Sequence, residues 1–241
     1  MSPPHFFVET LEPGRVLLTD EDSRHALRSL RLRPGDRLSL ADGQGAVAEG
    51  GLTAEVAGRA AIDVAAVRRV ERSSPALSMA VAPPKGERLA WAVQKLGELG
   101  VDELVLVRAD HSVRAWKGEG AANRTVSRLR AVAREAAMQS RRPFVMEVRE
   151  PVSLTDAIEA RGADVVALWE GAPEPLLAGL PLETPAVRIV VGPEGGFSDR
   201  EVQAMRGGGA VLASLGPGIL RTETAAIVGA AVVLARYGRL G

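Results

Sequence analysis

Apolar and polar positions along the chain change their spacing near residue 75. Beyond that point, short apolar runs alternate with longer segments in which apolar residues return every three or four positions. The short runs have the length of buried strands, and the longer segments have the periodicity of helices with one buried face. This alternation predicts an α/β fold with a mostly parallel sheet covered by helices. Strands are predicted at residues 77–82, 104–107, 165–168, 188–191 and 211–215, and helices at residues 87–99, 123–138, 153–160 and 222–237.

Two of the predicted helices have clear boundary signals. The helix at residues 87–99 has an apolar face, and Gly100 follows it as the residue that ends it. Ser198 and Glu201 have the spacing of a capping box, in which each side chain binds the backbone N–H of the other residue. A further helix is therefore expected to start directly after Phe197.

The first seventy or so residues have a different pattern, with short extended stretches separated by turns. Asp20 is a candidate N-cap for a short helix that runs to Leu30. Residues 73–75, Ser-Ser-Pro, form a candidate linker. The sequence thus predicts a small β-rich domain at residues 1–72 and a larger α/β domain at residues 73–241.

The composition is typical of a globular protein, with 46% apolar and 25% charged residues in a chain of 241. No apolar run approaches the roughly 18 to 20 residues that span a bilayer, and the N-terminus lacks the basic start of a signal peptide. The chain has no cysteine, and its three histidines are scattered, so neither a disulfide nor a metal site is expected. A cytoplasmic protein is the simplest interpretation.

Charge is balanced overall but unevenly distributed. Thirty basic residues match thirty acidic ones, yet residues 24–37 hold five arginines and one acid. Residues 108–142 hold nine basic residues and three acids. Arginine offers a planar fork suited to phosphates and base edges, whereas a genome rich in G and C would produce the same preference for arginine. Both explanations remain open on composition alone.

Three predicted loops follow the carboxyl ends of strands, which is where ligands bind in open α/β sheets. They cover residues 169–171, 192–196 and 215–221. Glycines in the second and third loops would let the backbone approach a ligand closely, and these loops also carry an acid, Glu194, and a base, Arg221. Glycine-rich tight turns without a ligand are the alternative.

Other nucleotide-binding and catalytic motifs are missing from the sequence. It has no phosphate-binding loop and no early dinucleotide fingerprint, which argues against a nucleotide-dependent oxidoreductase. Asp110, His111 and Ser112 are residue types of a catalytic triad, but adjacent residues cannot face one another as a triad requires. A polar loop is expected there instead.

The second and third loops resemble those of a known family. Residues 192–198, GPEGGFS, with Glu201, and residues 219–225, ILRTETA, resemble the RsmE family. Members of that family are 16S ribosomal RNA (uracil-N3)-methyltransferases of the SPOUT superfamily. Segments similar to the family also occur at residues 25–35, 94–101 and 135–143, so the resemblance spans nearly the whole chain.

This resemblance implies an N-terminal PUA-like β-barrel that binds RNA and a C-terminal SPOUT-type domain whose parallel sheet contains a trefoil knot. It also implies a homodimer, with 16S ribosomal RNA in the small subunit as substrate and S-adenosylmethionine as cofactor. Small residues such as Ala226 and Gly229 on the last predicted helix fit close packing between subunits, and equally within one subunit. The implied cofactor-binding residues are Leu168, Trp169, Glu170, Gly192, Pro193, Glu194, Gly195, Gly196, Leu215, Gly216, Gly218, Ile219 and Leu220. For Trp169, simple packing is the favoured alternative.

Two loop residues are candidates for the chemistry. Uracil N3 must lose its proton during methyl transfer, so negative charge develops on the base. We hypothesise that Arg221 stabilises this charge and that Glu194 orients groups or accepts the proton. The alternatives for Arg221 are a phosphate contact or an ion pair with Glu223 or Glu194. The alternative for Glu194 is a capping role on the following helix.

RNA contacts are expected from basic residues in the two arginine-rich segments, and their binding should weaken as salt rises. A solvated helix face is the alternative. Methylation of another RNA position and a non-catalytic RNA-binding assembly module are the remaining functional alternatives. The candidate RNA-binding residues are Arg24, His25, Arg28, Arg31, Arg134, Arg141 and Arg142.

Overall fold

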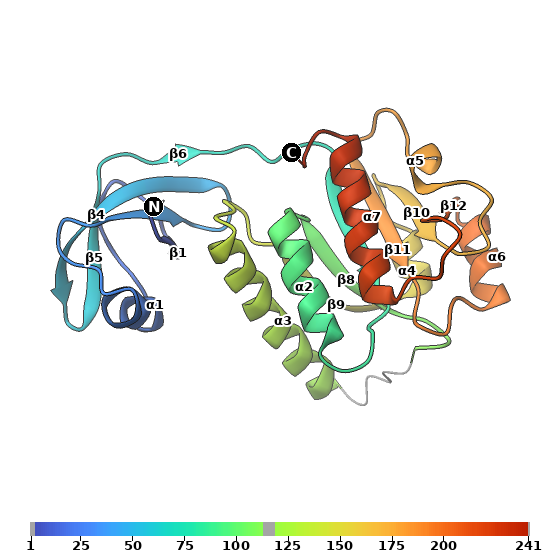
Figure 1. The fold of residues 1–241 in the computed structure, drawn as a ribbon, viewed down its shortest axis with the longest axis horizontal. Coiled ribbons are helices and arrows are strands. Elements are labelled where there is room, and N and C mark those ends of the chain that lie inside the picture. The colour runs from blue at the N-terminus through green and yellow to red at the C-terminus, as the bar shows by residue number, and fades with distance from the viewer. Residues whose placement is uncertain (1–2, 113–118, 241) are drawn as a thin grey trace. The chain divides into compact units, whose positions relative to one another are not determined.

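The computed structural model describes residues 3–112 and 119–240. The chain divides into two compact units. Residues 1–72 and 137–145 form the first unit, and residues 73–136 and 146–241 form the second. The chain therefore leaves the first unit after Arg72 and returns to it for nine residues. That return has no signal in the spacing of apolar positions. Figure 1 shows the fold coloured in chain order, with most of its elements labelled.

The first unit is built on a six-stranded sheet with the order β1-β3-β4-β5-β2, in which β6 also pairs with β4. β1 and β3 are parallel, and the other pairs are antiparallel. The strands are β1 (His5–Phe7), β2 (Gly14–Leu17), β3 (Arg37–Ala41), β4 (Ala46–Val56), β5 (Arg59–Val64) and β6 (Arg68–Arg69).

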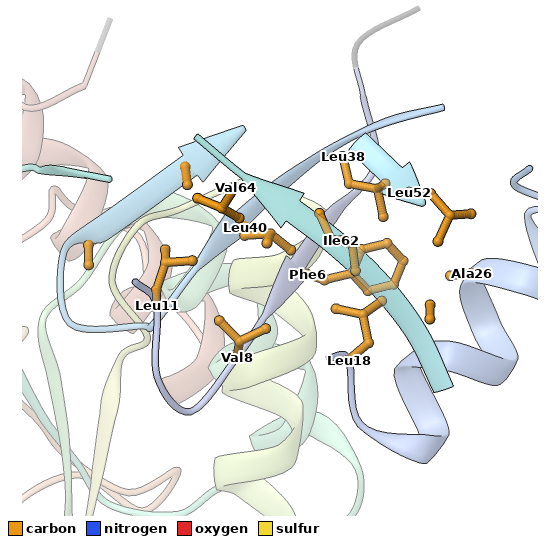
Figure 2. Packing of buried hydrophobic residues seen from close by; sticks show 13 residues of the cluster. Phe6, Val8, Leu11, Leu18, Ala26, Leu38, Leu40, Leu52, Ile62 and Val64 are labelled. Atoms are coloured by element: carbon orange, nitrogen blue, oxygen red, sulfur yellow. The ribbon is translucent and has the colours of Figure 1, made fainter. Parts of the chain in front are cut away.

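The core of the first unit follows from strand alternation, because every second side chain of a strand points to the same face. Leu38 and Leu40 of β3 and Ile62 and Val64 of β5 lie in one buried cluster with Phe6 of β1. Figure 2 shows these side chains converging, together with Leu18 and Leu52. Four side chains of this cluster are almost completely buried, those of Phe6, Leu38, Leu40 and Ile62. The cluster therefore joins the sheet to the helical segment that follows β2.

The expected helix after residue 19 differs from the prediction in two ways. Its N-cap is Thr19, not Asp20, because the Thr19 side chain accepts a hydrogen bond from the Asp22 backbone N–H. The α-helical part, α1 (Asp20–Arg24), is short and continues as a π-helical turn, η1 (His25–Ser29). In that turn the Leu30 N–H donates to the His25 carbonyl five residues earlier.

The second unit contains the predicted parallel sheet. Six strands lie in the order β12-β10-β11-β7-β8-β9, and every adjacent pair is parallel. β9 was not predicted, since its sequence, EVREPVS, is polar and it lies at the sheet edge. The strands are β7 (Ala76–Val81), β8 (Glu103–Arg108), β9 (Glu147–Ser153), β10 (Asp164–Leu168), β11 (Ala186–Val191) and β12 (Val211–Ala213).

Helices cover both faces of this sheet (Figure 1). α4 and α6 cover one face, where Ala80, Val105 and Val190 lie in their shared core. α2 and α7 pack against each other on the opposite face, and Gly229 of α7 lies directly over Leu168 and Ile189. The helices are α2 (Arg88–Leu99), α3 (Glu119–Gln139), α4 (Leu154–Ile158), α5 (Leu176–Gly179), α6 (Asp199–Gly207) and α7 (Thr222–Arg236).

The predicted helix boundaries in the second unit are largely confirmed. Gly100 ends α2 in the left-handed conformation, with φ of 87°. Ser198 and Glu201 form the predicted capping box at the start of α6. α3 begins four residues earlier than expected, and α5 was not predicted. Within the described ranges, no helix is long and apolar enough to cross a membrane.

Candidate active site

A pocket opens at the carboxyl ends of three adjacent strands, β12, β10 and β11. Its volume is about 560 Å³ when the part open to solvent is included. All three predicted loops contribute to it. The lining residues are Leu168, Trp169, Glu170, Val191, Gly192, Pro193, Gly196, Phe197, Leu215, Gly216, Gly218, Ile219, Leu220, Thr222 and Ala225.

The pocket brings together eleven of the thirteen residues expected to bind the cofactor. Glu194 and Gly195 are the two that do not line it. Four lining residues were not singled out from the sequence: Val191, Phe197, Thr222 and Ala225. Phe197, Thr222 and Ala225 lie inside the two sequence motifs, so their position there was the available signal.

Two glycines of the pocket have conformations or neighbours that disfavour a side chain. Gly196 has a φ of +72°, in the left-handed region that favours glycine. A Cβ atom on Gly192 would lie 3.0 Å from the Phe197 ring. The second loop therefore folds back on itself, and the Thr222 hydroxyl fixes it to the start of α7 by donating to the Gly192 carbonyl at 2.9 Å.

Glu194 forms an ion pair with an arginine that was not predicted from the sequence. The Arg88 Nη1 atom lies 3.0 Å from Glu194 Oε1, and Arg88 Nε lies 3.6 Å from Glu223 Oε1. The expected alternative for Glu194, a helix-capping role, is wrong because Ser198 and Glu201 cap α6. Arg88 is the first residue of α2, 106 positions from Glu194. Local spacing carries no signal for a pair so distant in sequence.

Arg221 is the N-cap residue of α7, and its side chain is exposed. The ion pair with Glu194 or Glu223, one alternative for Arg221, is not present among the described residues, where both acids pair with Arg88. In the described part of the chain no salt bridge is recorded for Arg221. A cation at a helix N-terminus is unfavourable for the helix dipole, so the location of Arg221 has no evident stabilising value. Its neighbours Leu220 and Thr222 both line the pocket.

The turn after β8 contacts the second loop. Asp110 accepts hydrogen bonds from the Ser198 hydroxyl at 2.7 Å and from Arg200 at 2.8 Å. The hydrogen bond from Ser198 is the largest cause that holds the pKa of Asp110 below its usual value, and the hydrogen bond from Arg200 contributes in the same direction. The Nδ1 atom of His111 lies beside the carbonyl oxygens of Gly195 and Gly196. The expected polar loop is therefore present, and it supports the glycine loop.

Trp169 both packs and lines the pocket. It lies against the core under α4 and α6, and the Arg206 guanidinium lies 5.6 Å from its ring centroid. A Cβ atom on Gly171 would clash with the Trp169 ring at 2.5 Å. The packing interpretation is thus confirmed, and the ring also forms part of the pocket wall.

The candidate RNA-binding residues are divided between the two units. Arg24, His25, Arg28 and Arg31 are exposed on α1, η1 and the turn that follows. Arg141 and Arg142 belong to the segment that returns to the first unit, whereas Arg134 is in the second unit. Arg114 and Lys117 of the basic stretch 108–142 lie outside the described residues. Among the described residues, no group of three His, Cys, Asp or Glu side chains gathers as a metal site would require.

Comparison with known families defines the class of protein. The profile described as an RNA methyltransferase domain matches residues 71–234, and that described as an RNA methyltransferase PUA domain matches residues 18–59. The chain belongs to this RNA methyltransferase family, and its fold is a mixed α/β fold with a parallel sheet and a PUA-like N-terminal domain.

The relatives that the chain resembles have a more specific name. It is 36% identical over 233 residues to ribosomal RNA small subunit methyltransferase E of Mycobacterium tuberculosis, covering 92% of this chain and 88% of the relative. The Bacillus subtilis protein of the same name is 30% identical, covering 86% and 85%.

Solved structures agree with this relationship. A putative methyltransferase of Legionella pneumophila in complex with S-adenosylmethionine has a TM-score of 0.88 and 29% identity, with 98% of both chains covered. Ribosomal RNA small subunit methyltransferase E of Neisseria gonorrhoeae, bound to S-adenosylmethionine, has a TM-score of 0.87 and 26% identity, again with 98% of both chains covered.

Proposed function

We propose that this protein uses S-adenosylmethionine to methylate N3 of a uridine in 16S ribosomal RNA of the small ribosomal subunit. One observation carries the proposal: the two motif loops, GPEGGFS and ILRTETA, form one pocket at the carboxyl ends of adjacent parallel strands. Similarity to small subunit methyltransferase E over most of the chain supports the choice of substrate. Action on ribosomal RNA in turn implies a cytoplasmic protein.

The residues of the pocket suit S-adenosylmethionine. Gly216 and Gly218 have open space where a side chain would begin, so a flat adenine can approach the backbone of residues 215–220. Glu170, an acid in the pocket lining, can accept hydrogen bonds from ribose hydroxyls or from the ammonium group of the cofactor. Residues 192–196 would face the ribose and methionine side. When bound, the cofactor supplies the methyl group from its sulfonium.

Arg221 and Glu194 are the proposed catalytic residues. As the uracil N3 proton leaves and the new N–C bond forms, negative charge on the uracil oxygens would be stabilised by the Arg221 guanidinium. Glu194 would accept or guide the proton, with Arg88 holding its carboxylate in place at 3.0 Å. This role for Arg221 fits its exposed position beside the pocket and the absence of a recorded salt bridge to it among the described residues.

Residues 1–72 and 73–241 are proposed to act as the RNA-binding and methyltransferase domains. Arg24, His25, Arg28 and Arg31 would contact phosphates from the first, joined by Arg141 and Arg142 of the returning segment, and Arg134 would do so from α3. The target base must be accessible, so a single-stranded or flipped uridine is expected.

A homodimer and a trefoil knot complete the proposal. Trp91 of α2 and Val228 of α7 are large apolar residues with 49% and 37% of their surface exposed, and α2 and α7 pack together. A second copy would cover them, as exposed apolar patches commonly mark interfaces. Light scattering of the purified protein would give the mass of one chain if this is wrong. We also propose that the three pocket loops are threaded through one another as a SPOUT-type knot.

A methyl-transfer assay tests the proposal directly. Small ribosomal subunits that lack N3-methyluridine are incubated with the protein and labelled S-adenosylmethionine, and the nucleosides are identified by mass spectrometry. We expect N3-methyluridine from the wild type, and an Arg221→Ala variant with much lower turnover but nearly unchanged cofactor affinity. Another methylated nucleoside would refute the substrate assignment while leaving the class of enzyme intact. Cofactor binding without transfer to any RNA would favour a non-catalytic assembly module.

A further inference from the structure

His111 makes a contact whose chemistry restricts its protonation. Its Nδ1 atom lies 3.2 Å from the Gly195 carbonyl oxygen and 3.1 Å from the Gly196 carbonyl oxygen. A carbonyl oxygen can only accept a hydrogen bond, so Nδ1 must carry the hydrogen and donate it. In the neutral ring this is the Nδ1–H form, which is the less common tautomer of free histidine.

These two carbonyls belong to the peptide groups on either side of Gly196. The Gly195 carbonyl is in the peptide that precedes Gly196, and the Gly196 carbonyl is in the peptide that follows it. One donor therefore holds both peptide planes around the residue with φ of +72° that lines the pocket. His111 can lie this close because Gly195 has no side chain. A Cβ atom on Gly195 would lie only 3.0 Å from His111 Cβ.

The histidine is itself held in place by its neighbours. The Asp110 N–H donates to Glu201 Oε1 at 2.8 Å, and the Asp110 carboxylate accepts from the Ser198 hydroxyl. The Ser112 N–H closes the turn on the Ala109 carbonyl. The turn after β8 thus binds the first turn of α6 through Asp110 and the end of the glycine loop through His111.

We propose that His111 is a positioning residue for the cofactor pocket: its Nδ1–H fixes the two peptide groups around Gly196 in the orientation that S-adenosylmethionine requires. His111 does not line the pocket, so it acts through the loop and not by touching the ligand. This inference rests on the proposed function, because S-adenosylmethionine is the ligand by which it is measured.

Three substitutions separate this role from simple space filling. The amide nitrogen of asparagine can lie where Nδ1 lies, whereas that of glutamine extends toward the position of Nε2. We expect His111→Asn to bind S-adenosylmethionine within about twofold of the wild type in isothermal titration calorimetry. His111→Ala and His111→Gln should bind it roughly 3- to 10-fold more weakly, as expected for loss of one net hydrogen bond. The melting temperatures of the three variants serve as the control for folding.

The tautomer is an independent readout that needs no ligand. Nitrogen-15 spectra of the imidazole rings should show neutral His111 protonated at Nδ1, with exposed His25 as the reference for the usual form. Neutral His111 protonated at Nε2, or His111→Asn binding as weakly as His111→Ala, would overturn the proposal. If the wild type binds no S-adenosylmethionine, the proposed function fails, and the tautomer still decides whether the hydrogen bond exists.

Discussion

Arg88 is predicted to stabilise the second unit mainly by its ion pair with the buried carboxylate of Glu223. Glu223 is 8% exposed at its side chain, and its Oε2 atom has no hydrogen-bond partner among the described residues. Its recorded salt bridge is to Arg88 Nε, at 3.6 Å. Glu194, with 26% exposure, is the more accessible partner of the same guanidinium. The perturbation is Arg88→Leu, which keeps much of the aliphatic bulk and removes the charge.

The magnitude follows from these exposures. The pair with Glu194 involves two partly exposed side chains, so its loss should cost no more than about 1 kcal/mol. Leaving the buried Glu223 carboxylate without its cation should cost about 1 to 3 kcal/mol. The sum, roughly 1 to 4 kcal/mol, corresponds to a fall in melting temperature of about 2 to 16 °C for a chain of this size.

The assay is thermal and urea unfolding followed by circular dichroism, on single and double variants. Glu223→Gln removes the buried charge, so Arg88→Leu/Glu223→Gln should recover much of the stability that Arg88→Leu loses. Arg88→Leu/Glu194→Gln is the matched control and should recover little. The reasoning is refuted if Arg88→Leu is as stable as the wild type, or if the two double variants are equally stable.

Three further outcomes follow from the structure. Gly196→Ala would force a side chain into the left-handed region at about 1 to 2 kcal/mol, so S-adenosylmethionine should bind about 5- to 30-fold more weakly by calorimetry. Gly162→Ala, with φ of +78° and open space outside the pocket, should leave binding unchanged, and equal effects would contradict the argument. The double variant Arg28→Ala/Arg31→Ala should make the fall of log RNA affinity with log salt concentration less steep, by roughly 2 in the slope. Arg37→Ala is the control and should change the slope less, because the charge that it removes is already paired with Glu49. Burial is the main cause that lowers the pKa of His5 below its usual 6.5, and the charge of Arg141 lowers it further. The unfolded state therefore takes up the proton first, so the free energy of unfolding should fall as pH decreases from about 6.5. This fall between pH 7 and pH 5.5 should be smaller in His5→Gln, and an identical slope in both proteins would exclude His5 as the cause.

Local patterns in the sequence were sufficient for five of the six strands of the parallel sheet, all but β9, and for most of the pocket. Parallel strands buried on both faces appear as nearly continuous apolar runs. β7, β10 and β11 coincide with such runs, which Ser78 interrupts in β7 and Arg188 interrupts in β11. Because carboxyl ends of parallel strands meet at one edge, loops that follow adjacent strands converge there. The capping box at Ser198 was also predictable, since its two partners are three residues apart.

The features that the sequence did not predict depend on pairs of residues distant along the chain. Arg88 binds an acid 106 positions away, and His111 binds carbonyls 84 and 85 positions away. Neither contact affects the local spacing of apolar residues. The N-cap was misplaced for a different reason: Thr19 and Asp20 are both good caps, and only the backbone geometry shows that Thr19 accepts the Asp22 N–H.

The return of residues 137–145 has a consequence for the way the protein is made. Ala137 packs in the first unit against Phe7, Ala41 and Val47, and the Pro143 carbonyl accepts from the Gly45 N–H. During synthesis the first 72 residues therefore emerge without part of the structure that completes their core. The ribosome must add more than sixty further residues, including most of α3, before that gap can be closed. Nascent chains usually fold domain by domain from the N-terminus. The buried residues of the first unit's main cluster lie within residues 1–72, so its sheet can form early, and the cover from residues 137–145 is added only after most of α3 has been made. A fragment cut after Arg72 would keep its sheet strands but lose this cover.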